Sequence, residues 1–168
     1  KASLEKLCKA CTFKEMICDI NMRKNCYCKE SAQFCLESAT VLKISDEEVE
    51  FLFGCTPEEG ADKLLNEFGV SLAMVTLGPN GAYLKNKNGS TYVKCPKVDP
   101  IDTTGAGDIF GGSAVWKILQ HGKAPEILTA EELKDIVSFA CTAAGLSTTK
   151  AGGISSVPEL DEINRRLT

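Results

Sequence analysis

Residues 102–112 read DTTGAGDIFGG and run directly into an apolar helical stretch. Gly105 and Gly107 flank Ala106, so unhindered backbone N–H groups stand at the start of the predicted helix, where they and the helix dipole can hold an anion. Asp108 follows in the first turn. A site that only stores an anion gains nothing from a fixed negative charge, so the pairing indicates chemistry. A base beside a phosphate cradle is what a kinase needs to deprotonate a hydroxyl during phosphoryl transfer.

Spacing excludes two other glycine-rich motifs. A dinucleotide-binding fingerprint needs G-x-G-x-x-G, and Phe110 stands where its third glycine would be. No G-x-x-x-x-G-K-[ST] occurs, so the chain is not a P-loop enzyme. The remaining interpretation is an ordinary helix start whose Asp108 complements the dipole. The complete string of residues 102–112 argues against an ordinary helix start.

The string DTTGAGDIFGG resembles the second signature of the ribokinase-like (PfkB) carbohydrate kinases. Three other segments resemble this family: VLKISDEEVE (41–50) its strand and helix ahead of the nucleotide site, VTLGPNGA (75–82) its nucleotide-binding strand and turn, and KAGGISSVP (150–158) its closing loop. The segments occur in family order and cover nearly the whole chain. DINMR (19–23) resembles the Asp-x-Asn-x-Arg of the fructokinase-like branch.

The resemblance implies an α/β fold in which a mostly parallel sheet carries helices on both faces. Family members are longer, and their N-terminal half carries the sugar-binding residues and a small β lid. Both are absent here, and residues 3–11 resemble a helix from the middle of such a protein. We therefore expect residues 1–168 to form one domain, the nucleotide-binding and catalytic C-terminal half of a ribokinase-like kinase. A natural half-length protein is the alternative.

The resemblance also implies roles for individual positions. Asp108 matches the catalytic base, and the N–H groups of Gly105, Ala106 and Gly107 match the anion hole. Arg23 is expected to contact the substrate, near phosphate or sugar. The positions expected to bind ATP with Mg²⁺ are Lys43, Ser45, Glu48, Thr76, Gly78, Gly81, Cys141 and Gly145. A potassium ion lies beside the anion hole in ribokinase-like enzymes, and the positions that match its ligands are Asp102, Thr104, Ser147, Lys150, Gly152 and Ser156.

Two of these assignments have structural alternatives. Ser45 followed three residues later by Glu48 is a capping box by pattern. The family usually has Asn-x-x-Glu here, with the Glu helping to hold magnesium-bound waters, so both roles stay open for Glu48. The segment around Arg23 could be an ordinary polar turn, although an arginine suits bidentate binding of an oxyanion.

Strand-like and helix-like segments alternate along the chain. Apolar strands are expected at 16–18, 40–44 and 72–77, and helices at 3–12, 29–38, 46–54, 57–68, 106–120 and 130–147. This alternation predicts a mostly parallel sheet covered on both faces. Ligands of such sheets bind at the carboxyl ends of the strands, and Asp19, Ser45 and Gly78 each follow a strand at that edge. Asn88-Gly89 predicts a hairpin turn.

The amino-acid composition limits the classes of molecule that the chain is expected to bind. The 168-residue chain carries a net charge of −4, with 43% hydrophobic and 25% charged residues. It has no basic footprint for nucleic acid or anionic membranes, and no apolar run long enough to cross a bilayer. Nine cysteines without a regular framework argue against a disulfide scaffold and favour a reducing compartment, the cytoplasm. Cys26-Tyr27-Cys28 lacks zinc-site spacing, and His121, the only histidine, is expected at a helix C-terminus.

The leading function is ATP-dependent phosphorylation of a sugar hydroxyl, as in a fructokinase, with a small-molecule sugar and ATP as partners. A 2-keto-3-deoxygluconate or nucleoside acceptor stays open, because the absent half mainly selects the acceptor. A non-catalytic kinase-like binding protein is the rival from a different class, which the intact Gly-Ala-Gly-Asp disfavours. The isolated chain is expected to be inactive, and its unpaired sheet edge favours a homodimer.

Overall fold

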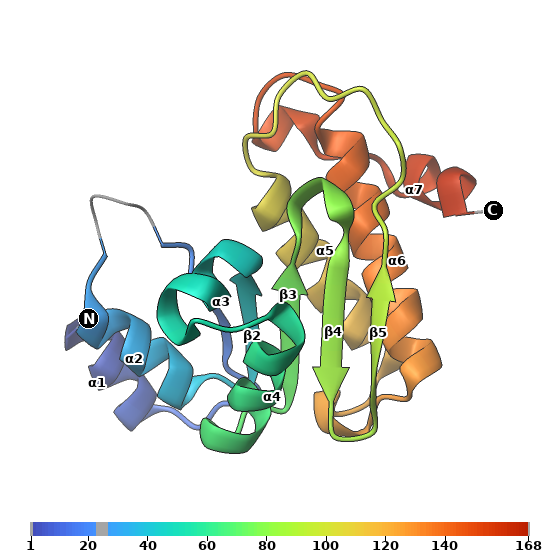
Figure 1. The fold of residues 1–168 in the computed structure, drawn as a ribbon. Helices are drawn as coiled ribbons and strands as arrows, with labels where there is room; N and C mark the ends of the chain where they lie inside the picture. The colour runs from blue at the N-terminus through green and yellow to red at the C-terminus, as the bar shows by residue number, and fades with distance from the viewer. Residues whose placement is uncertain (1, 23–26, 168) are drawn as a thin grey trace.

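The computed structural model describes residues 2–22 and 27–167, and its centre is a five-stranded sheet (Figure 1). The strands lie side by side in chain order. They are β1 (Ile17–Asp19), β2 (Val41–Ser45), β3 (Leu72–Thr76), β4 (Ala82–Asn86) and β5 (Gly89–Val93).

The sheet is mixed. β1, β2 and β3 pair in parallel, whereas β4 is antiparallel to both β3 and β5. Four of the five strands therefore point the same way and only β4 opposes them. The predicted mostly parallel sheet is confirmed, with one hairpin added to it.

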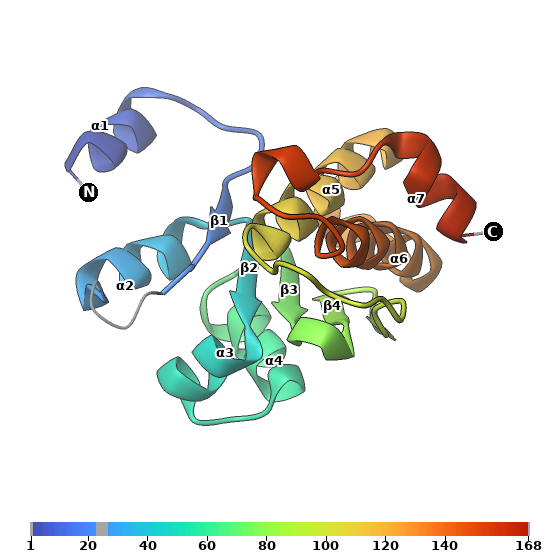
Figure 2. The same cartoon turned by 90° about the horizontal axis from the view of Figure 1, so that it is seen from above.

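Helices cover both faces of the sheet (Figure 2). One face packs against α2 (Lys29–Ser38), α3 (Asp46–Phe53) and α4 (Pro57–Glu67), and the other against α5 (Ala106–His121) and α6 (Ala130–Ser147). Because successive strand residues point to opposite faces, β3 divides its side chains between two cores. Leu72 and Met74 join the α5–α6 core, and Ala73 and Val75 join the other.

The two terminal helices lie outside these layers. In Figure 2, α1 (Ala2–Ala10) stands apart from the sheet at the β1 side. At the other end α7 (Leu160–Leu167) packs on α6, where Ile163 contacts Phe139 and Ala143. Among the described residues, no helix combines the length and apolarity that a membrane crossing requires.

Local signals explain where the helices begin and end. Capping boxes start α3, α4 and α6, and the one predicted at Ser45 and Glu48 is confirmed. Helix α5 ends at His121, followed by Gly122 in the left-handed conformation (φ 64°). The expected position of His121 at a helix end is therefore confirmed, and its Nε2 lies 2.9 Å from Oδ2 of Asp135 on α6.

The predicted hairpin is present as β4–β5, but its turn lies one residue earlier than expected. Lys87 and Asn88 form the turn, and Gly89 already pairs with Asn86 as the first residue of β5. The shift has a local cause. Oδ1 of Asn86 accepts the N–H groups of Asn88 (2.9 Å) and Gly89 (3.1 Å), an Asx-type turn that sets the register.

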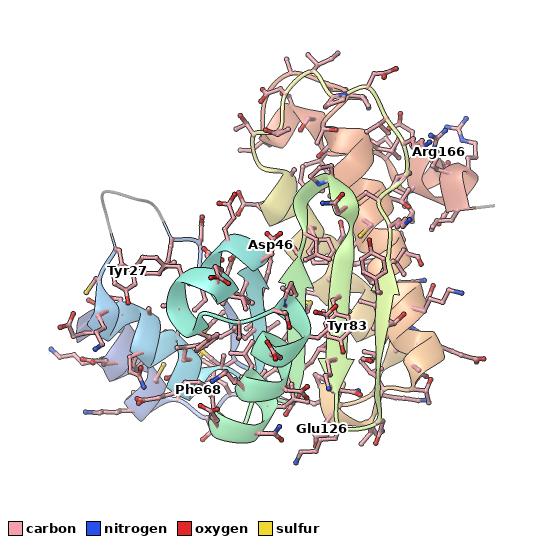
Figure 3. All side chains as sticks on the ribbon, in the orientation of Figure 1. Tyr27, Asp46, Phe68, Tyr83, Glu126 and Arg166 are labelled. Atoms are coloured by element: carbon pink, nitrogen blue, oxygen red, sulfur yellow. The ribbon has the colours of Figure 1, made fainter. Side chains whose placement is uncertain are left out.

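The two ends of the sheet differ. In Figure 3, Asp46 marks the end where β2 finishes, and Glu126 lies at the opposite end. The long loops after β5 and after α6 arch over the first of these ends (Figure 1). The carboxyl ends of the parallel strands therefore face the start of α5 and both loops, which is where ligands of such sheets bind.

Candidate active site

The glycine-rich string forms the first turn of α5. Gly105 is the N-cap residue and has a left-handed backbone (φ 78°), which glycine adopts without strain. The N–H of Ala106 donates to Thr103 O (3.2 Å), so it is already engaged in the turn. The N–H groups of Gly105, Gly107 and Asp108 make no hydrogen bond within the described part of the chain. A helix start with free donors is suited to an anion.

Asp102 fastens the closing loop to the helix start. Its Oδ1 accepts the N–H of Thr104 (2.9 Å) and its Oδ2 accepts the N–H of Gly152 (2.9 Å). Hydrogen bonds from Thr104, together with the N–H of Gly152, lower the pKa of this carboxyl to about 2. The loop then approaches so closely that a Cβ on Gly105 would lie 3.3 Å from Cα of Gly153.

A cavity of about 670 Å³ opens beside this helix start. Its walls are the turn after β3, the loop after β5, the first turn of α5 and the end of α6. The predicted nucleotide and anion-hole positions that line it are Thr76, Gly78, Gly81, Ala106, Gly107 and Gly145. Residues far apart in the sequence thus share one hollow.

Two of these glycines are required by close approaches. A Cβ on Gly81 (φ 119°) would overlap the carbonyl oxygen of Val93 on the neighbouring strand. A Cβ on Gly145 would lie 3.1 Å from Cγ of Pro96, in the loop that closes the cavity. The glycines therefore let the walls of the cavity approach each other closely.

A second cavity, of about 250 Å³, lies on the other side of the same helix start. Asp108 lines this smaller cavity together with Asp19 of β1 and Lys43 of β2. Within the described part of the chain, no hydrogen bond or ion pair engages the Asp108 carboxylate. A free carboxylate beside an anion-binding helix start is available to accept a proton.

Lys43 is a buried cation between β2 and α5. Its Nζ donates to Oδ2 of Asp19 (2.7 Å), and its side chain is only 11% exposed. The side chain of Lys43 runs along two glycines that lie one helical turn apart. A Cβ on Gly107 would lie 3.5 Å from its Nζ, and a Cβ on Gly111 would lie 3.3 Å from its Cδ. The glycines leave a path along α5 for the lysine, whose ammonium ends beside the first turn.

Ser45 and Glu48 line neither cavity. Glu48 is buried, and its two carboxylate oxygens accept the N–H of Met22 (2.5 Å) and of Ser45 (2.8 Å). Its structural role is therefore established by these contacts. Its role toward magnesium-bound waters stays a prediction.

Cys141 lies behind the wall of the larger cavity. Cys141 is 1% exposed and does not line this cavity. Cys95 packs against the same core cluster and does line the cavity. The sequence analysis missed Cys95 and the loop from Pro96 to Pro100, which also lines the cavity. Their only local signal is two prolines within a segment that has no secondary structure.

The predicted potassium positions gather around the loop after α6. Ser147 and Ser156 are buried, and their hydroxyls donate to Ala144 O (2.7 Å) and Gly153 O (2.8 Å). Nζ of Lys150 is paired with Glu162 at 3.1 Å. Among the described residues no group of three His, Cys, Asp or Glu could hold a metal ion. Backbone carbonyls need no such group, and the potassium ligands stay a prediction.

Arg23 falls outside the described residues, so its predicted contact with substrate is not assessed by the structure. The described residue just before this gap is Met22, whose N–H binds Glu48. The preceding residue, Asn21, has a left-handed backbone (φ 43°). The segment therefore leaves the end of β1 through a sharp turn.

The sequence model of the "pfkB family carbohydrate kinase" matches residues 1–160. The chain belongs to this family. The match covers the glycine-rich helix start, both cavities and the closing loop. The sequence resemblance is thereby confirmed, and the sheet with helices on both faces is the ribokinase-like fold.

Individual family members support the same assignment. Fructokinase-2 of Solanum habrochaites is 36% identical over 130 residues, which is 75% of this chain and 38% of that protein. A fructokinase double mutant of Vibrio cholerae O395, solved with fructose, ADP and potassium ion, is 28% identical with a TM-score of 0.76, covering 92% of this chain and 51% of the other. An E. coli protein named as a ribokinase II, solved with ATP and Mg²⁺, is 28% identical with a TM-score of 0.73, covering 88% and 46%. The chain thus spans about half the length of its pfkB-family relatives, or less.

Proposed function

We propose that this chain is the nucleotide-binding and catalytic part of an ATP-dependent sugar kinase. The observation that carries the proposal is the start of α5, which separates two cavities. Gly107, with a free N–H, lines the larger cavity, and the adjacent residue, Asp108, places its free carboxylate in the smaller one. A donor phosphate and an acceptor hydroxyl can therefore meet across one turn of helix.

The proposed reaction uses these two groups together. Asp108 accepts the proton of the acceptor hydroxyl as its oxygen bonds to the γ-phosphorus, and the bond from γ-phosphorus to the bridging oxygen breaks to release ADP. The N–H groups of Gly105 and Gly107 stabilise the negative charge on the transferring group. Ala106, whose N–H already binds Thr103, contributes by shaping the turn.

Lys43 adds positive charge at the boundary of the two cavities. Its ammonium lies beside Gly107 and makes its one described hydrogen bond to Asp19. An ammonium is a common partner of phosphate oxygens. We assign Lys43 to the terminal phosphate of ATP, with Asp19 holding the side chain in position before the nucleotide binds.

The chain also has residues suited to the expected ions. Magnesium would neutralise charge on the ATP phosphates and keeps most of its waters, and Glu48 stands near the end of β2, where it could reach only through such waters because both its oxygens are engaged. Potassium, bound by Asp102 and carbonyls of the loop after α6, would add positive charge beside the anion hole. The ADP- and potassium-bound and ATP- and Mg²⁺-bound relatives support both ions.

Fructose is the acceptor that the comparison with relatives supports best. The named proteins with 36–37% identity include fructokinases from several plants, and a fructose-bound fructokinase shares the fold. Ribokinases and an aminoimidazole riboside kinase are also similar, which keeps a nucleoside-like acceptor as the second candidate. We also propose a reducing, cytoplasmic location, which the irregular spacing of the nine cysteines favours.

A chimera tests the proposal. Residues 1–168 are joined to the N-terminal half of a fructokinase relative, and ADP release is measured with fructose. We expect Asp108→Asn to lower kcat by about 10²–10⁴-fold while the KM for ATP changes little, because general-base catalysis is lost and binding is kept. Asp135→Asn, on α6 and remote from both cavities, is the matched control. A near-normal kcat in Asp108→Asn would remove this residue from the mechanism.

A further inference from the structure

Among the described residues, two pairs of cysteines lie close enough for their thiols to interact, and their surroundings differ. Cys95 follows β5 and contacts Cys141 of α6, and Cys18 of β1 contacts Cys35 of α2. Each pair joins elements that are distant in sequence. The first pair lies at the larger cavity and the second lies at the β1 edge of the sheet.

The thiols of the first pair are unequal. Cys95 is partly exposed and lines the larger cavity, with its Sγ 3.7 Å from the carbonyl oxygen of Gly78. Cys141 is fully enclosed in the α5–α6 core behind it. One sulfur can thus be reached from the cavity, and its partner only through that first sulfur.

Electrostatics favours reaction at the exposed member. A hydrogen bond from Cys141 lowers the pKa of Cys95, whereas the hydrogen bond with Cys95 and burial raise the pKa of Cys141. In the second pair, burial and the neighbouring Cys35 raise the pKa of Cys18 to about 12. Since the thiolate is the reactive form, the two pairs should differ sharply in reactivity.

We propose that Cys95 is an oxidation site for peroxides within the proposed nucleotide cavity, and that Cys141 is its resolving thiol. An accessible thiol beside a second, enclosed thiol is the arrangement of many redox-sensing cysteines. The assignment of the pair stands on the cavity and the contact. Only its consequence for ATP rests on the proposed function.

The chemistry balances with one peroxide. The Cys95 thiolate attacks a peroxide oxygen, an S–O bond forms as the O–O bond breaks, and the released oxygen leaves as water after taking a proton. The Cys141 sulfur then attacks the sulfur of this sulfenic acid while its proton passes to the S–O oxygen, so the S–S bond forms as the S–O bond breaks and a second water leaves. Two thiols are oxidised to a disulfide and hydrogen peroxide is reduced to two waters.

The disulfide would tie the loop after β5 to α6. That loop already approaches α6 one turn further along, where Gly145 faces Pro96. Both residues line the same cavity as Cys95. Fixing the loop at this point should hold the cavity wall in one position, and a bound nucleotide should in turn shield Cys95 from oxidants.

The experiment treats the 168-residue chain with hydrogen peroxide, blocks the remaining thiols and maps the peptides by mass spectrometry. We expect a peptide linked through Cys95 and Cys141 to form at least about tenfold faster than one linked through Cys18 and Cys35, because peroxide reaches Cys95 through the cavity and the pKa of Cys95 is lowered. In Cys141→Ser, dimedone should trap a sulfenic acid at Cys95. In Cys35→Ser, no such adduct should form at Cys18.

Each outcome is decisive. Equal rates for the two pairs, or no dimedone adduct at Cys95 in a folded Cys141→Ser variant, would overturn the proposal. The second arm repeats the oxidation with saturating ATP and Mg²⁺, which should slow modification of Cys95 but not that of Cys55, a thiol outside the cavity. If the linked peptide forms and ATP does not protect Cys95 from oxidation, the proposed thiol pair is confirmed and the proposed position of the nucleotide is wrong.

Discussion

The larger and the smaller cavity are separated by one turn of α5, yet they are built to different degrees. The larger one is enclosed by the turn after β3, the loop after β5, the start of α5 and the end of α6, and the loop meets the helix at Pro96 and Gly145. The smaller one lies between α5 and the strands β1, β2 and β3, and its outer border is β1, a three-residue strand at the sheet edge whose Ile17 is 45% exposed. The larger cavity is therefore enclosed by loops that pack on the helices, whereas the smaller one is bordered on one side by a partly exposed edge strand. Binding of a nucleotide and transfer of its phosphate should be separable here.

The largest effect should be the loss of transfer in the isolated chain. The chain spans about half the length of its relatives, and we propose that the rest of the acceptor site lies in the part it does not span. The acceptor should then not be held in line with the phosphate, and lost positioning can cost about 10⁵–10⁸-fold in rate. We expect calorimetry to detect ATP with Mg²⁺ while a coupled assay over several ketoses detects no turnover. A full-length fructokinase is the positive control. Rapid turnover of any sugar would show that the smaller cavity is already a complete acceptor site.

The second largest effect should come from obstructing the larger cavity. Gly107→Val places a branched side chain at the anion-binding turn and against the ammonium of Lys43, so ATP affinity should fall by about 100-fold or more, the worth of two charge-assisted hydrogen bonds. Gly112→Val is the matched control on the same helix, since a Cβ there meets nothing within 4 Å. Titration calorimetry compares the two. Equal affinities in both variants would mean that the phosphates bind elsewhere.

The boundary between the cavities is tested by Lys43→Met. If Lys43 contacts the terminal phosphate, ATP affinity should fall about tenfold, as expected for one charge-assisted hydrogen bond, and ADP affinity should stay the same. Lys85→Met removes a comparable ion pair, with Asp62, from β4 and should change neither. Parallel titrations with ATP and ADP give the ratio of the two affinities for each variant. A loss of affinity that is equal for both nucleotides would contradict the assignment.

The smallest effect concerns the loop after α6, which Asp102 holds against the start of α5. The pKa of Asp102 is lowered from 3.8 to about 2, so its stabilisation is fully present above pH 3.8 and is lost as the pH falls toward 2. Amide exchange should then show the N–H groups of Thr104 and Gly152 losing protection a few-fold across this window. Asp102→Asn should give the same loss at neutral pH. Unchanged protection in both cases would show that Asp102 does not hold the loop.

The sequence predicted those parts of the molecule that depend on local patterns. The alternation of strands and helices, the capping box at Ser45 and the hairpin at Asn88 are encoded within a few residues, and all are present. The glycine-rich helix start was predicted for the same reason. Two details differ: the N–H of Ala106 is engaged by the preceding turn, and Gly105 lines neither cavity. The anion-binding role of this turn stays a prediction.

The sequence could not reveal contacts that depend on long-range register. Asp19 and Lys43 are direct neighbours only because β1 and β2 pair in that register. Cys95 reaches the larger cavity because β5 directs the following loop toward α6. Neither position carries a motif of its own, so sequence reasoning gave Lys43 without its partner and Cys141 without Cys95.

The path of Lys43 along α5 couples the residue types that fit at three positions, 43, 107 and 111. Glycine inside a helix costs about 1 kcal/mol relative to alanine, so Gly107 and Gly111 weaken α5 while they leave room for the side chain of Lys43. A lineage that shortened the lysine would lose the reason to keep Gly111, and alanine could enter there and strengthen the helix. Positions 43 and 111 should therefore drift together among descendants of this chain, while Gly107 stays fixed by the anion site.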